Sequence, residues 1–179
     1  MIRKYTISVY TENFIGLLNR ITIIFTRRHI NIESVTVSES EVKGVHRYTI
    51  VVKTTEQQVE KVVKQIEKLV EVIKAFYFTN EETIFQEIAL YKVSTREINN
   101  GRNFERLIRD HHARILTMES EFVVIEKTGH KEETQDLLLQ LKPFGVLEFA
   151  RSGRVAITKP MKEFSSYLRE IEESKMAQV

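Results

Sequence analysis

The N-terminal half of the chain switches repeatedly between two hydrophobic periods. Apolar and polar residues alternate over residues 5–9, which is the period of a strand with one buried face. Apolar residues then recur at intervals of three or four across residues 17–25, which predicts a helix that opens at Gly16. Stretches rich in β-branched residues at 30–38 and 45–54 predict two further strands.

The next segment carries the clearest helical pattern in the chain. Apolar residues form one stripe along it, while lysine and glutamine residues take the other side. The stripe consists of Val59, Val62, Val63, Ile66, Leu69 and Val70. A strand is predicted at residues 72–78, so that the order of elements is β-α-β-β-α-β. This order is typical of a ferredoxin-like sandwich, in which two helices cover one face of an antiparallel sheet.

The same order of elements repeats in the C-terminal half. A polar break at residues 79–83 predicts a domain boundary before the repeat. Strands are expected at residues 84–93, 113–118, 122–127, 146–150 and 155–157. Helices are expected after Gly101 and over residues 137–141, where Pro143 and Gly145 end the second helix.

Together these patterns define the expected organisation of the chain. The fold class is α+β, with two ferredoxin-like (βαββαβ) domains at residues 1–79 and 84–158. A C-terminal amphipathic helix is expected at residues 159–179. Its apolar face carries Met161, Phe164, Leu168 and Ile171.

Composition excludes several classes of protein. The 179 residues include no cysteine, which fits a reducing compartment and excludes disulfide scaffolds and thiol catalysis. A formal net charge of only +2 gives no electrostatic reason to expect a nucleic acid partner. The N-terminus runs straight into a strand pattern, and no apolar run reaches the roughly 20 residues of a membrane span. We therefore expect a soluble cytoplasmic protein without a membrane partner.

The residues that could carry catalysis or hold a metal are scattered. The histidines are His29, His46, His111, His112 and His130, and no H-E-x-x-H or similar ligand spacing is present. The sequence also lacks a Walker loop, a G-x-G-x-x-G motif and a G-x-S-x-G motif. We therefore expect no catalytic residue, no metal site and no cofactor in this chain.

Two known uses of the βαββαβ architecture fit the residues poorly. An RNA-recognition module needs several exposed aromatic residues on its central strands, and the third predicted strand has only Tyr48. An acylphosphatase-like enzyme needs a phosphate-binding arginine after its first strand. Residues 11–16 contain a glutamate and no arginine, so neither activity is expected.

The turn between the first strand and the first helix has the chemistry of a small-ligand receptor. The first amides of a helix lack internal acceptors and, together with the helix dipole, favour a carboxylate. Gly16 allows a ligand to approach the backbone, and the side-chain oxygens of Asn13 and Asn31 can accept from an ammonium group. The predicted effector-binding residues are Asn13, Ile15, Gly16, Leu17, Leu18, Asn31 and Ile32.

Apolar residues beside this turn are expected to form a wall for the ligand side chain. They are Ile15, Leu17, Ile32 and Val35. Burial of an isopropyl group contributes roughly 1.5–3 kcal/mol, so polar contacts and a second subunit are also needed. The residues alone leave open a simpler alternative, in which Asn13 only caps the helix and Asn31 only starts a strand.

The residues around the second strand resemble a known family. Residues 27–37 read R-R-H-I-N-I-E-S-V-T-V. They are similar to the R-R-G-Y-N-I-E-S-L-T-V signature of the small, regulatory subunit of acetolactate synthase (acetohydroxyacid synthase). Residues 87–93 are similar to its E-L-x-L-x-K-V segment, and residues 150–153 match its A-R-S-G motif. The resemblance covers nearly the whole chain and identifies residues 1–79 as an ACT domain.

The resemblance implies a regulatory function. Members of this family bind a catalytic large subunit that carries thiamine diphosphate, Mg²⁺ and FAD. They raise its activity and confer feedback inhibition by valine, sometimes with isoleucine or leucine. The effector lies between the ACT domains of two small subunits, so a homodimer is expected, and Asn13, Gly16 and Asn31 correspond to the family's effector-site residues. An alternative is a stand-alone ACT-type amino-acid sensor that regulates a different enzyme.

The chain departs from the family pattern close to the expected effector site. Phe14 and Ile15 are bulkier than the small or polar residues often found between the family's asparagine and glycine. His29 replaces the usual glycine, and Ile30 replaces the usual aromatic residue. These differences bear on effector preference and on the strength of inhibition.

Overall fold

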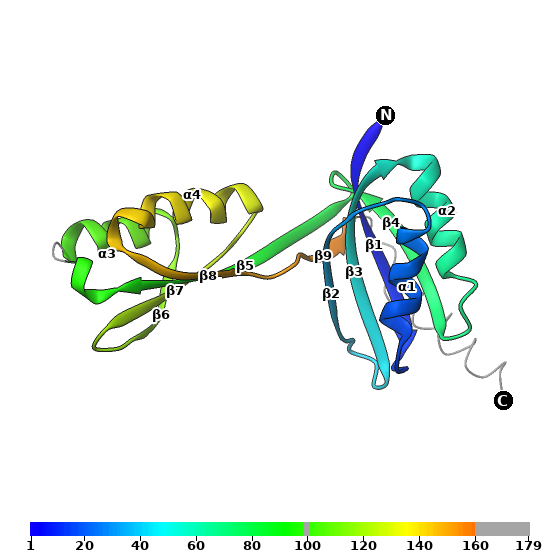
Figure 1. Ribbon diagram of the computed structural model, residues 1–179, viewed down its shortest axis with the longest axis horizontal. Coiled ribbons are helices and arrows are strands. Elements are labelled where there is room, and N and C mark those ends of the chain that lie inside the picture. The colour runs from blue at the N-terminus through cyan, green and yellow to red at the C-terminus, as the bar shows by residue number, and fades with distance from the viewer. Residues whose placement is uncertain (99–100, 160–179) are drawn as a thin grey trace. The chain divides into compact units, whose positions relative to one another are not determined.

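The chain folds into two units, each built on an antiparallel sheet (Figure 1). The computed structural model describes residues 1–98 and 101–159. The first unit contains Met1–Ile84 together with the segment that begins at Val155. Its elements are β1 (Ile2–Glu12), α1 (Leu17–Thr26), β2 (Ile32–Glu39), β3 (Val45–Thr55), α2 (Glu56–Ile66) and β4 (Val72–Thr79).

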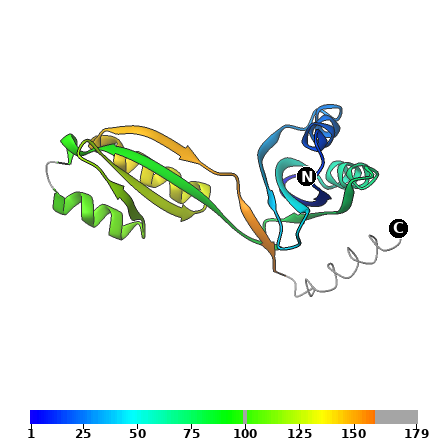
Figure 2. The same cartoon turned by 90° about the horizontal axis from the view of Figure 1, so that it is seen from below.

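The first unit is a two-layer sandwich. Its sheet has the strand order β2-β3-β1-β4, and every neighbouring pair is antiparallel. Helices α1 and α2 lie on one face of this sheet (Figures 1 and 2). Apolar residues from the helices and the strands meet in one core, whose buried members include Ile7, Leu17, Ile21, Ile50 and Ile66. The predicted β-α-β-β-α-β order is confirmed.

Helix α2 ends earlier than its apolar stripe predicts. The helix ends at Ile66, and the chain then turns, with the Leu69 amide donating to the Ile66 carbonyl at 3.0 Å. Leu69 still packs against the core. Val70 is exposed, so the prediction that it belongs to the buried stripe is wrong. The turn after Ile66 breaks the helical period and leaves Val70 on the surface.

The second unit, Phe85–Arg154, repeats the order of the first. Its elements are β5 (Thr83–Ser94), the short 3-10 helix η1 (Thr95–Glu97), α3 (Gly101–Asp110), β6 (Arg114–Met118), β7 (Phe122–Gly129), α4 (Lys131–Leu141), the 3-10 helix η2 (Lys142–Phe144) and β8 (Val146–Arg151). The strand order is β6-β7-β5-β8, and β9 (Val155–Thr158) also pairs with β5. The predicted fold class, with two sheet-and-helix units of βαββαβ order, is confirmed.

The segment after the second unit returns to the first one. The Arg47 guanidinium donates to the Ala156 carbonyl at 2.6 Å, and the Lys159 amide donates to the Glu82 carbonyl at 2.8 Å. These bonds explain why the second unit ends at Arg154, whereas the sequence places the end of its second domain at residue 158. The C-terminal helix expected at residues 159–179 lies outside the described residues, apart from Lys159.

The A-R-S-G motif at residues 150–153 joins β8 to β5. The Ser152 amide donates to the Ile88 carbonyl at 2.8 Å, and the Ile88 amide donates to the Ser152 hydroxyl at 3.0 Å. Arg151 lies 3.5 Å from the carboxylate of Glu87, which is itself buried. The motif therefore has a structural role in closing this edge of the second sheet.

Helices α1 and α3 end in the same way. After α1, the Ile30 amide donates to the Phe25 carbonyl at 3.0 Å, and His29 adopts a left-handed conformation with φ 54°. After α3, the Ala113 amide donates back into the helix at 2.9 Å, and His112 has φ 50°. This is the Schellman arrangement, in which glycine is preferred because it has no Cβ. A glycine at position 29 would therefore fit this backbone better than histidine does.

We expect His29→Gly to raise the free energy of unfolding by about 0.5 kcal/mol. A left-handed residue with a Cβ costs about 1–2 kcal/mol, and the greater freedom of glycine in the unfolded chain offsets about 0.4–1 kcal/mol of that gain. Urea unfolding of the two proteins measures the difference. His46→Gly is the matched control, because His46 lies within β3 and a glycine there should destabilise the sheet. A loss of stability in His29→Gly would contradict the prediction.

The core of the second unit contains a buried tyrosine whose titration is shifted. The Tyr91 hydroxyl donates to the Thr134 carbonyl at 2.6 Å, and burial raises the pKa of Tyr91 to about 12. Folding therefore favours the neutral phenol. Its contribution to the free energy of unfolding is complete below pH 10 and is lost as the pH rises toward 12. Relative to Tyr91→Phe, the wild type should lose about 1.4 kcal/mol of stability between pH 8 and pH 11. Parallel stability curves for the two proteins would contradict this assignment.

Candidate functional site

The loop between β1 and α1 has a backbone shape that only a few residue types tolerate. Gly16 is the N-cap of α1 and has φ 82° and ψ −2°. The Leu17 amide donates to the Phe14 carbonyl at 3.3 Å, and the Arg20 amide donates to the Gly16 carbonyl at 3.2 Å. A Cβ on Gly16 would meet no atom within 4 Å. Glycine is therefore required here by the positive φ and not by close packing within one copy of the chain.

The first turn of α1 presents hydrogen-bond donors and contains no acidic side chain of its own. Within the described part of the chain, the amides of Leu18 and Asn19 donate to no acceptor. No acidic residue lies in the first turn, and no side chain caps the helix. The partial positive charge of the helix N-terminus is therefore available to an external anion. A carboxylate is one of the anionic groups that such donors bind.

The structure places the two predicted asparagines on either side of α1. Asn13 follows β1 and is exposed, and no hydrogen bond of its side chain is found among residues 1–98 and 101–159. The alternative that Asn13 caps the helix is wrong, because Gly16 occupies the N-cap position. Asn31 is exposed and immediately precedes β2, where its side-chain amide can meet a ligand. Both side chains are therefore accessible.

The predicted apolar wall is only partly available. Ile15 is 96% exposed, Leu18 is 43% exposed and Val35 is 39% exposed. Leu17 is 0% exposed and belongs to the core, which corrects the expectation that its side chain lines a ligand. Ile32 is half-buried and packs against the same core. The side chains of Ile15, Leu18 and Val35 are therefore exposed, whereas the side chain of Leu17 is held in the core.

A pair of charged residues outside the predicted set lies beside this loop. Arg20 lies in the first turn of α1, and its Nη1 is 2.5 Å from Oε1 of Glu71 in the connection between α2 and β4. The hydrogen bond from Arg20 lowers the pKa of Glu71, so this carboxyl is held in its charged form. The two residues are far apart in the sequence, and neither stands in a motif.

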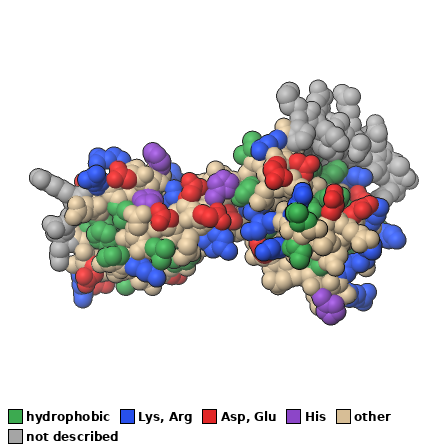
Figure 3. Space-filling model, turned by 90° about the horizontal axis from the view of Figure 1, so that it is seen from above, with side chains coloured by type: hydrophobic (Ala, Val, Ile, Leu, Met, Phe, Trp, Pro, Cys, Tyr) green, Lys and Arg blue, Asp and Glu red, His purple; other side chains and the backbone are tan. Residues whose placement is uncertain are grey.

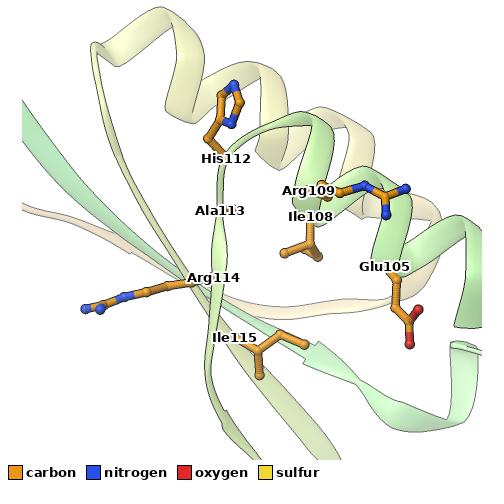
Figure 4. Close-up of a pocket in the computed structure, with 7 residues that line it drawn as sticks. All are labelled: Glu105, Ile108, Arg109, His112, Ala113, Arg114 and Ile115. Carbon is orange, nitrogen blue, oxygen red and sulfur yellow. The ribbon is translucent and has the colours of Figure 1, made fainter.

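A hollow lies in the second unit, between α3 and β6 (Figure 4). Its apolar floor is formed by Ile108, Ala113 and Ile115. The charged residues around it point away from one another, and Arg114 pairs with Glu126 at 2.6 Å. Because its polar groups do not converge on one point, this hollow lacks the geometry of a specific ligand site.

The remaining surface offers no strong alternative. Figure 3 shows acidic and basic side chains interspersed on both units in that view. Among the described residues, no three His, Asp or Glu side chains are grouped so that they could hold a metal ion. None of the helices in residues 1–98 and 101–159 has the length and apolar character needed to cross a membrane. The loop before α1 is therefore the best-supported candidate site.

The fold and this loop define an ACT-type module joined to a second ferredoxin-like unit. Residues 7–74 match a family model described as an AHAS small subunit-like ACT domain. Residues 86–160 match one described as the small subunit of acetolactate synthase. The chain belongs to the acetolactate synthase small subunit family.

Several relatives match over nearly their full length. The acetolactate synthase small subunit of Bacillus subtilis is 37% identical over 168 residues, which cover 91% of this chain and 95% of that protein. The probable acetolactate synthase small subunit of Archaeoglobus fulgidus is 36% identical and covers 89% of this chain and 99% of its own length. The crystal structure of the Thermotoga maritima small subunit matches with a TM-score of 0.80 and 32% identity, over 88% of this chain and 98% of that one.

Proposed function

We propose that this chain is a non-catalytic regulatory subunit that binds a branched-chain amino acid, with valine as the first candidate. It acts on the catalytic large subunit of acetolactate synthase, where thiamine diphosphate, Mg²⁺ and FAD are expected to reside. The observation that carries the proposal is the start of α1, where Gly16 is left-handed, the first turn contains no acidic residue, and the Leu18 and Asn19 amides have no acceptor among the described residues. Membership of the small subunit family supports the choice of partner.

The contacts of the effector follow from its chemistry. Its carboxylate binds the amides at the start of α1, and its ammonium group binds the side-chain oxygens of Asn13 and Asn31. Its branched side chain lies against Ile15, Leu18 and Val35, which are exposed in a single copy. The solvent-exposed surface of a single copy would bind such a ligand weakly. Burial of the ligand between two copies of the chain is therefore needed for affinity.

The edge of the first sheet supports a homodimer of ACT domains. Strand β2 is at one end of the strand order, so its outer backbone groups have no partner strand within the first unit's described sheet. Its exposed residues include Val35 and Val37. An exposed edge strand with apolar side chains is a natural pairing site for a second copy. The same edge lies next to Asn31, so that pairing would enclose the effector.

Regulation then follows from linkage. Valine that binds one conformation of the complex more tightly shifts the population toward that conformation. A coupling free energy of about 1–3 kcal/mol changes the affinity or the activity about 5–150-fold. Regulation of this kind therefore requires no catalytic group in this chain.

Reconstitution with the catalytic subunit from the same organism tests the proposal. The chain should be retained with that subunit in a pull-down, should raise its rate of pyruvate condensation, and should make this rate sensitive to valine. The purified chain alone should not turn over pyruvate. Retention of a different enzyme, with no effect on acetolactate formation, would favour a stand-alone sensor of the ACT type. Turnover of pyruvate by the chain alone would contradict the proposal.

A further inference from the structure

Glu71 holds both ends of the loop that precedes α1. It lies in the connection between α2 and β4, one residue before β4 begins. Its backbone carbonyl accepts a hydrogen bond from the amide of Glu12, the last residue of β1, at 2.9 Å. Its side chain accepts from the Arg20 guanidinium at 2.5 Å. One residue therefore fixes the strand that enters the loop and the helix that leaves it.

The side-chain contact is more protected than an ordinary surface ion pair. The Glu71 side chain is 14% exposed, and the Arg20 side chain is 41% exposed. The second carboxylate oxygen, Oε2, is buried and has no hydrogen-bond partner among the described residues. A buried carboxylate with one unpaired oxygen is costly, so this ion pair is weak evidence for a purely stabilising role of Glu71.

The charge arrangement is also matched to an anionic ligand. A free carboxylate near the start of α1 would compete with the effector for the helix N-terminus. Arg20 neutralises Glu71 and holds its Oε1 by a direct hydrogen bond. The Arg20–Glu71 pair therefore holds the loop without adding a net negative charge beside it.

We propose that Glu71 is the positioning residue of the effector site. Its two bonds fix the geometry of residues 13–19, so that the Leu18 and Asn19 amides are aligned before the effector carboxylate arrives. This inference rests on the proposed function for the identity of the ligand, whereas the order of the loop can be measured without a ligand. Glu71 contacts no effector, and it acts only through Glu12 and Arg20.

Amide hydrogen exchange without any ligand gives the first test. In Glu71→Gln, exchange of the hydrogen-bonded Leu17 and Arg20 amides at the start of α1 should become about tenfold faster, while exchange in β1 and β3 stays unchanged. Glu67→Gln is the matched control, because it removes the neighbouring Lys74–Glu67 ion pair of 3.2 Å but no bond to the loop. Arg20→Gln should reproduce the effect of Glu71→Gln. Unchanged exchange of the Leu17 and Arg20 amides in a folded Glu71→Gln protein would overturn the inference.

Calorimetry with valine gives the second test. Valine should bind Glu71→Gln about five- to tenfold more weakly than the wild type, and the double variant with Arg20→Gln should be no weaker than either single variant. Glu67→Gln should bind valine within about twofold of the wild type, because a surface ion pair contributes little. Equal valine affinity in Glu71→Gln and the wild type would overturn the inference. Absence of valine binding to the wild type would instead contradict the proposed function, while the exchange result would stand.

Discussion

In a Gly16→Asp variant, valine should no longer inhibit the reconstituted enzyme, although the variant should still activate it. The aspartate places a second carboxylate where the effector carboxylate docks. Two such charges about 4 Å apart repel by about 4 kcal/mol at an effective dielectric constant of ~20, which exceeds the gain from burying the valine side chain. Valine titration of acetolactate formation measures the effect.

The space around Gly16 allows a side chain to be added with little disturbance of the fold. A Cβ at this position meets no atom within 4 Å in one copy, and aspartate and asparagine tolerate a positive φ better than other residues do. Gly16→Asn is therefore the matched neutral control, with nearly the same shape and the same backbone demand. It should retain part of the valine inhibition. Equal loss of inhibition in both variants would mean that bulk, and not charge, blocks the site.

The second large effect is expected for Asn31→Ala. The variant removes the polar partner of the effector ammonium at the start of β2, and the lost hydrogen bond should weaken valine binding by about 1–3 kcal/mol. This corresponds to an increase in the dissociation constant of roughly 5–150-fold. Calorimetry on the purified chain measures it directly.

Asn80→Ala provides the control for this substitution. Asn80 is exposed in the turn between β4 and β5, outside the effector loop, so the same change of residue type should leave valine affinity unchanged. The Asn31 variant should also keep the melting temperature of the wild type within a few degrees, because Asn31 is exposed. Unchanged affinity in Asn31→Ala would remove this residue from the site.

The order of the elements could be predicted because each element is marked by local signals. The period-two pattern of β1, the helical stripe of α2 and the pair Pro143–Gly145 after α4 depend only on neighbouring residues. The errors arise where tertiary structure decides the outcome. Val70 continues the helical period in sequence, but the chain leaves the helix at Ile66. The return of β9 to the first unit depends on Arg47, which lies far away in sequence.

The candidate site divides in the same way. Gly16 could be predicted because a glycine directly before an apolar helical stripe indicates a tight turn into the helix. The structure gives Gly16 the positive φ that such a turn uses. The predicted role of Leu17 in lining the ligand was wrong, because Leu17 begins the apolar stripe of α1 and its side chain is buried in the core. The role of Glu71 could not be predicted, because its partners Glu12 and Arg20 lie more than 50 residues away in sequence and contact it only through the tertiary fold.

The central claim is that the start of α1 recognises the carboxylate of a free amino acid, and a comparison of valine with valinamide tests it most directly. The two compounds share the ammonium group and the side chain, and differ only in the anionic end. Calorimetry on the purified chain should show saturable binding of valine and at least tenfold weaker binding of valinamide. Equal binding of both compounds, or no binding of valine, leucine or isoleucine at millimolar concentration, would contradict the account.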